Sequence, residues 1–92
     1  MKTAKEILDQ IAQPSVEIDT APDATKGALV RINGNRKGLE DLAEIIRATA
    51  AGLGTQRCST MLSASGGPIL SADSTSNVMI HCHSHFPNDS SD

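Results

Sequence analysis

Three histidines alternate with smaller residues near the end of the 92-residue chain, in the segment His81-Cys82-His83-Ser84-His85. Alternate side chains of a β-strand share a face, so His81 and His83 are expected to project together. Two imidazoles at this spacing can chelate a metal ion, but catalytic zinc takes three protein ligands and structural zinc takes four. His85 or a carboxylate would supply the third ligand. The segment therefore predicts either a zinc site or a histidine stripe that faces a partner or solvent.

The other reactive side chains do not form a recognisable catalytic group. Cys82 would point away from its histidine neighbours on a regular strand, so a cysteine–histidine pair is not implied. Cys58 and Cys82 are more typical of small buried apolar residues, and they are expected to stay reduced in a cytosolic protein. Ser63 and Ser65 lie in no Gly-x-Ser-x-Gly elbow. These patterns predict a protein that is not an enzyme, with a metalloenzyme built on the histidines as the alternative.

The segment from Val30 to Gly54 predicts a strand, a tight turn and an amphipathic helix. Asn35 is the expected N-cap of this helix, and Gly52 or Gly54 is expected to end it in a left-handed conformation. Apolar residues recur at three- and four-residue steps, which predicts one buried stripe. The residues expected in the core are Leu39, Leu42, Ile45, Ile46 and Leu53. The acidic residues Glu40, Asp41 and Glu44 are expected largely on the other face.

Two cations stand at the start of this helix. Arg36 and Lys37 could attract an anion to the helix N-terminus, where free backbone N–H groups and the helix dipole favour negative charge. The glycines at Gly34 and Gly38 do not have the spacing of a P-loop or of a dinucleotide-binding loop. A solvated turn with two exposed cations is the simpler interpretation.

The remaining elements complete a small α+β fold. A short helix is expected at residues 3–11, with Thr3 and Glu6 as a capping box. Strands are expected near residues 16–19, 29–32, 57–63 and 77–84, with a shorter one beginning at residue 69. We therefore expect a three- to four-stranded, mostly antiparallel sheet with the long helix packed on one face. Residues 1–86 would form a single domain, and residues 87–92 a mobile polar tail.

Composition restricts the partners and the compartment. All eight Lys and Arg lie between Lys2 and Arg57, the net charge is −3, and the only aromatic residue is one Phe. Nucleic-acid binding usually needs a basic patch, often with stacked aromatics, so it is not expected. The sequence has no apolar run long enough for a membrane span and no apolar leader, which predicts a cytoplasmic protein.

The expected hydrophobic core is small, because Leu, Ile, Val and Phe make up only about a fifth of the chain. Because such a core is small, we hypothesise that a homodimer or another protein partner stabilises it.

The strand-turn-helix segment resembles the bacterial immunity protein 32 family. The resemblance lies in Gly34-Asn35, Gly38-Leu39 and Leu42-Ala43, and it extends over roughly residues 29–83. It implies a strand ending in a tight turn, a helix and two further strands. It also implies a binding protein that neutralises a cognate toxin by protein–protein interaction, without a cofactor. A small metal-binding protein that uses zinc at His81 and His83, and a non-catalytic interaction subunit, are the alternative interpretations.

Overall fold

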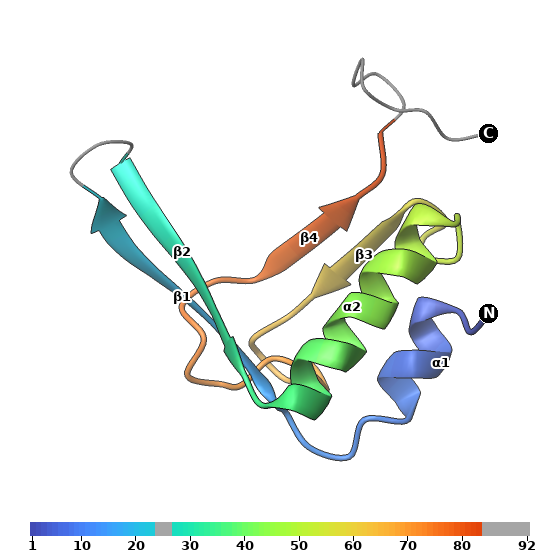
Figure 1. The fold of residues 1–92 in the computed structure, drawn as a ribbon, viewed down its shortest axis with the longest axis horizontal. Coiled ribbons are helices and arrows are strands. Elements are labelled where there is room, and N and C mark those ends of the chain that lie inside the picture. The colour runs from blue at the N-terminus through green and yellow to red at the C-terminus, as the bar shows by residue number, and fades with distance from the viewer. Residues whose placement is uncertain (24–26, 84–92) are drawn as a thin grey trace.

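The computed structural model describes residues 1–23 and 27–83. His85 and the expected polar tail at 87–92 lie outside the described residues. The elements are α1 (Ala4–Asp9), β1 (Val16–Asp23), β2 (Gly27–Gly34), α2 (Arg36–Ala50), β3 (Ser59–Leu62) and β4 (Val78–His81) (Figure 1). The α+β class, the long second helix and the short first helix are confirmed.

The strands form two antiparallel hairpins and not one sheet. β1 pairs with β2 from Val16↔Gly34 to Asp23↔Gly27, and β3 pairs with β4 from Ser59↔His81 to Leu62↔Val78. The antiparallel pairing is as expected, but the continuous sheet is replaced by two pairs of strands. Figure 1 shows that the two hairpins diverge, with the far end of β1–β2 extending away from the helices.

The segment at residues 69–75 joins the hairpins by covering the outer edge of β1. Leu70 forms a single parallel bridge with Val16, where a short strand was expected. The Val16 N–H donates to the Ile69 carbonyl at 3.1 Å, and the Ser71 N–H donates to the Val16 carbonyl at 2.7 Å. Further along, the Thr75 N–H donates to the Ile18 carbonyl at 2.8 Å. This segment therefore serves as an irregular third strand beside β1.

Local sequence signals set the ends of both helices. The Thr3 side chain accepts from the Glu6 N–H and the Glu6 carboxylate accepts from the Thr3 N–H, which is the expected capping box. The Asn35 side chain accepts from the Gly38 N–H at 2.7 Å at the start of α2. Gly52 has a φ of 80° just after α2, in the left-handed region that glycine adopts without strain. Both predicted N-caps and the glycine stop are thus confirmed.

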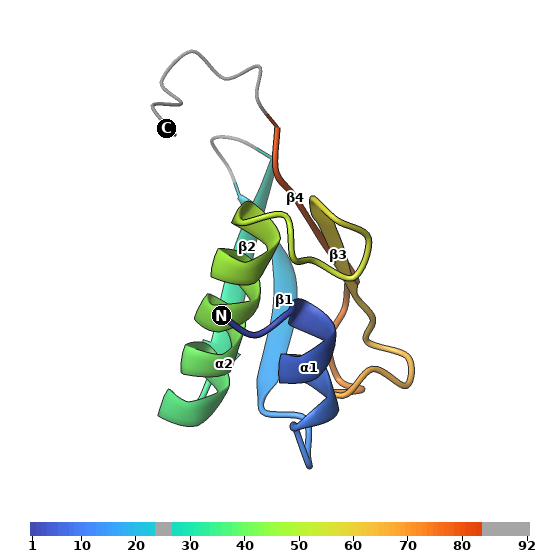
Figure 2. The same ribbon diagram turned by 90° about the vertical axis from the view of Figure 1, so that its right-hand side faces the viewer.

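The core lies between α2, α1 and the two hairpins. Figure 2 shows α1 beside α2, and both strands of the β3–β4 hairpin contact α2. Leu42 and Ile45 are buried as expected, and Leu53 packs against the core at its edge. The other buried apolar residues come from all parts of the fold: Ala4, Ile7, Val16, Ile18, Ala48, Leu62, Ile69 and Leu70.

Two of the expected core residues are on the surface. Leu39 is 41% exposed and Ile46 is 46% exposed, so their assignment to the core was wrong. The buried side of α2 runs instead through Gly38, Leu42, Ile45 and Thr49. The reason is the divergence of the β1–β2 hairpin, which leaves one flank of the apolar stripe uncovered.

Candidate functional site

Of the three histidines, His81 is the last residue of β4 and His83 lies two residues beyond it. The rings of His81 and His83 stack with their centroids 4.2 Å apart and an angle of 24° between their planes. The Ser59 hydroxyl of β3 lies 2.7 Å from His81 Nδ1, across the hairpin. Alternation on the strand thus brings the two imidazoles together. In residues 1–23 and 27–83, no group of three or more His, Cys, Asp or Glu is placed to hold a metal ion.

Two methionines extend this exposed face along the hairpin. Met61 and Met79 are directly opposed in the β3–β4 register, and both are about half exposed. Met79 lies two residues before His81, so the two side chains share a face. Sequence reasoning missed the methionines, although the same alternation that grouped the histidines includes Met79. The outer face of β3–β4 therefore carries two methionine side chains at one end and the imidazole rings at the other.

The opposite face of the hairpin packs towards α2. Val78 and Ile80 are half-buried against the core. The Cys82 Sγ lies 4.0 Å from the Ala50 carbonyl at the end of α2. Both Cys58 and Cys82 are exposed, so the expectation that they are buried apolar residues was wrong. They lie at the open end of the hairpin, beyond the last strand pair, where the core does not reach.

The cations at the start of α2 are engaged within the helix. Arg36 forms an ion pair with Glu40 at 3.7 Å, and Lys37 forms one with Asp41 at 2.5 Å. The hydrogen bond with Asp41 raises the pKa of the Lys37 ammonium above its usual value. Asp41 is buried, although the sequence pattern predicted that it would lie on the solvent face of the helix. Each cation thus has a carboxylate one turn away, and the geometry does not gather them around an external anion.

An uncovered apolar surface runs from β2 to α2. A Cβ added to Gly34 would lie 3.2 Å from the Leu39 side chain, so Leu39 packs against the end of β2. Ile32 and Val30 precede Gly34 at two-residue steps and share its face. Ile46 lies two helical turns beyond Leu39 on the same side of α2. We call these four side chains the β2–α2 surface: Val30, Ile32, Leu39 and Ile46, which are 59%, 53%, 41% and 46% exposed.

The backbone edge of β2 borders this surface. β1 is the only strand hydrogen-bonded to β2 within the described ranges, and the 69–75 segment covers β1, not β2. β2 therefore presents one edge of N–H and C=O groups along an eight-residue strand. Its central cation, Arg31, is held by Asp19 on the other face. An exposed edge with apolar side chains is a template for pairing with another chain.

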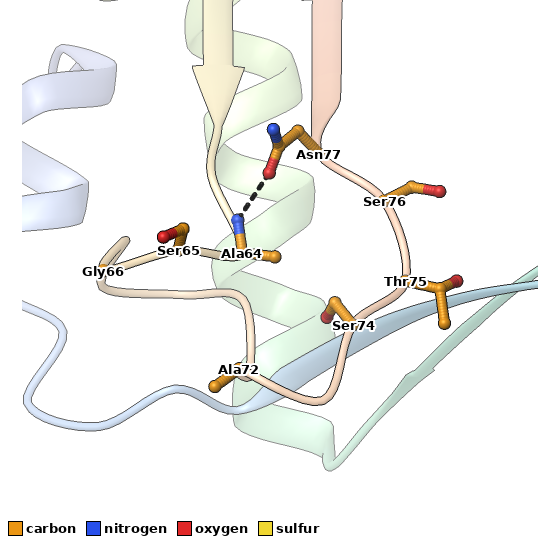
Figure 3. Close-up of a pocket in the computed structure, with 8 residues that line it drawn as sticks. All are labelled: Ala64, Ser65, Gly66, Ala72, Ser74, Thr75, Ser76 and Asn77. Atoms are coloured by element: carbon orange, nitrogen blue, oxygen red, sulfur yellow. Dashed lines mark hydrogen bonds between the residues drawn. The ribbon is translucent and has the colours of Figure 1, made fainter.

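A hollow with a volume of about 490 Å³ lies at the connecting end of the β3–β4 hairpin (Figure 3). Three of its polar side chains accept hydrogen bonds from backbone N–H groups. Ser74 and Thr75 accept the N–H groups of Ile18 and Thr20, and Asn77 accepts the Ala64 N–H at 2.8 Å. These hydrogen bonds fasten the segment before β4 to β1 and β3, which gives the hollow a structural role.

Comparisons with known protein families, with curated proteins and with solved structures find no match for this chain. Within residues 1–23 and 27–83, no helix has both the length and the apolar character to cross a membrane.

Proposed function

We propose that this chain is a protein-binding domain without catalytic activity, and that the β2–α2 surface and the outer edge of β2 form its binding site. The observation that carries the proposal is the combination of an eight-residue strand edge with four exposed aliphatic side chains beside it. Large exposed apolar patches usually mark sites of interaction.

The partner that fits this site is a protein with an extended segment. Such a segment would add a strand beside β2 through main-chain hydrogen bonds and place alternate apolar side chains over Ile32 and Leu39. The net charge of −3 favours a partner with a basic surface, because opposite charges speed the encounter of two proteins.

The specific form that we propose is neutralisation of a bacterial toxin in the cytoplasm. The resemblance of residues 29–83 to an immunity protein supports this form, and the same residues include β2 and α2. A toxin acting on nucleic acid would often be basic, which matches the charge of this chain. Binding of this kind needs shape and charge complementarity and no cofactor.

The experiment is a binding titration with the purified product of the gene beside this one. Ile32→Lys should weaken binding by tenfold or more, about 1.4 kcal/mol, because it places a charge in the apolar contact. Met61→Lys is the matched control, since Met61 is equally exposed but lies on β3. Equal loss of binding in both variants, or no binding by the unaltered chain, would reject the proposal.

A further inference from the structure

The pairing of β3 with β4 brings the two cysteines of the chain opposite each other. Ser59↔His81 is the last pair of the ladder, and the next residues outward are Cys58 and Cys82. The Cys82 N–H donates to the Cys58 carbonyl at 2.8 Å, so the antiparallel pairing continues to this position. The cysteines are distant in sequence, and only the hairpin register makes them neighbours.

The spacing of an antiparallel strand pair suits a disulfide at this position. Hydrogen-bonded residues in an antiparallel pair have their Cα atoms about 5.5 Å apart. This separation lies within the roughly 4.4–6.8 Å that a disulfide spans. Directly opposed residues also carry their side chains on the same face. Both cysteines are exposed, so a small oxidant can reach either sulfur.

A tight turn fixes the position of Cys58. Arg57 has a φ of 60°, and the Gly54 N–H donates to the Arg57 carbonyl at 2.7 Å. A Cβ at Gly54 would lie 2.6 Å from the Ser59 carbonyl oxygen, so the turn closes tightly on the start of β3. Cys82 contacts the end of α2, where its Sγ lies 4.0 Å from the Ala50 carbonyl.

We propose that Cys58 and Cys82 form a reversible disulfide that closes the open end of the β3–β4 hairpin. The oxidant is a low-molecular-weight disulfide such as glutathione disulfide. One cysteine loses its proton and its thiolate attacks a sulfur of the oxidant, which forms a mixed disulfide and releases one glutathione thiolate. The second cysteine thiolate then attacks the protein sulfur and releases the second glutathione. Two cysteine thiols are oxidised by two electrons, one glutathione disulfide is reduced, and the two protons pass to the departing thiolates.

The disulfide would stabilise the weaker of the two hairpins. β3 and β4 have four residues each, against eight in each of β1 and β2. A covalent link between Cys58 and Cys82 also restricts the unfolded chain, because it closes a loop that contains both strands. Oxidation would therefore raise the melting temperature without changing the position of the β2–α2 surface. This inference goes beyond the proposed function and does not depend on it.

The test is oxidation of the full, reduced chain with glutathione disulfide, followed by intact and peptide mass spectrometry. We expect a monomer with a mass lower by about 2 Da, a peptide pair joined through Cys58 and Cys82, and a melting temperature that rises and then falls again with dithiothreitol. Cys58→Ser and Cys82→Ser should each give a mixed disulfide with glutathione and no such rise.

A register control separates this geometry from the mere presence of two thiols. The variant Cys82→Ser/His81→Cys moves the second thiol by one residue to the opposite face of β4, where it should not form the intramolecular link. Equal cross-linking in this variant would overturn the proposal. So would glutathione adducts or disulfide dimers as the only products of the unaltered chain, or a melting temperature that does not rise in the linked monomer.

Discussion

The hydroxyls of Thr49 and Thr60 meet at 2.7 Å in the core, where both residues are fully buried. Thr49 donates to the Ile45 carbonyl at 2.8 Å, so Thr60 must donate to Thr49. Thr60 in turn accepts the Thr55 N–H at 3.2 Å. One chain of hydrogen bonds therefore joins α2 to the turn before β3 and to β3 itself. A buried polar pair of this kind is favourable only while every member is satisfied.

Replacing Thr60 with Val should destabilise the protein by about 1–3 kcal/mol, because the buried Thr49 hydroxyl loses its hydrogen-bond donor and the Thr55 N–H loses its acceptor. The double variant Thr49→Val/Thr60→Val should cost less than the sum of the two single changes, because the hydroxyls act as a pair. Urea unfolding measures each free energy. Thr20 and Thr75 form a similar but exposed pair at 3.3 Å, so Thr20→Val is the control and should change stability by less than about 0.5 kcal/mol. Additive costs for Thr49 and Thr60 would contradict the hydrogen-bond chain.

Leu42→Ala should cost about 2–4 kcal/mol, since it removes a buried side chain and leaves a cavity between the helices and the hairpins. Ile46→Ala is the matched control on the same helix. It should cost less than about 1 kcal/mol, because Ile46 is already 46% exposed and alanine is a better helix former. Chemical denaturation of both variants checks the difference. Similar losses would show that Ile46 is covered in solution, as it would be in a homodimer.

Gly38→Ala should destabilise the protein although alanine favours helices. A Cβ at this position would lie 2.4 Å from the Ser15 carbonyl oxygen and 2.7 Å from its hydroxyl. Overpacking against backbone costs about 1–3 kcal/mol, which exceeds the gain of about 1 kcal/mol in helix propensity. Glu44→Ala, at an exposed position of α2, should be nearly neutral. A thermal melt that is unchanged or higher for Gly38→Ala would show that residue 15 does not approach α2 so closely.

The capping box of α1 should make stability depend on pH in the acidic range. Hydrogen bonds with the Thr3 backbone and side chain lower the pKa of Glu6 below 4.5. A carboxyl with a depressed folded pKa contributes stability above its unfolded pKa, and this contribution is lost as the pH falls through the folded value. The melting temperature of the unaltered chain should therefore exceed that of Glu6→Gln at pH 7, and the gap should narrow below pH 4.5. Parallel curves between pH 7 and pH 3 would be evidence against a role for this charge.

The features that the sequence predicted well depend on neighbouring residues. The capping box at Thr3, the cap at Asn35 and the left-handed Gly52 involve only one or two turns of chain, so short patterns specify them. The alternation of side chains also correctly predicted that His81 and His83 lie together.

The features that the sequence did not predict depend on distant segments. The exposure of Leu39 and Ile46 follows from the divergence of the hairpins. The periodicity of apolar residues along a helix does not specify how distant strands are oriented. The opposition of Cys58 and Cys82 requires the register of two strands with a long connection. Asp41 was expected on the solvent side of α2, but α1 and the segment after it cover that side, as the hollow shared by Gln10, Lys37 and Asp41 shows.

The covering of β1 by residues 69–75 has a consequence for the order in which the fold can be completed. During synthesis the first hairpin and α2 leave the ribosome while the outer edge of β1 still lacks these hydrogen-bond partners. The contact of Val16 with Leu70 closes only when most of the chain has been made. Non-local contacts of this kind slow folding, and an open strand edge can meanwhile capture other chains. The nascent protein can therefore misassemble until residues 69–75 have been synthesised.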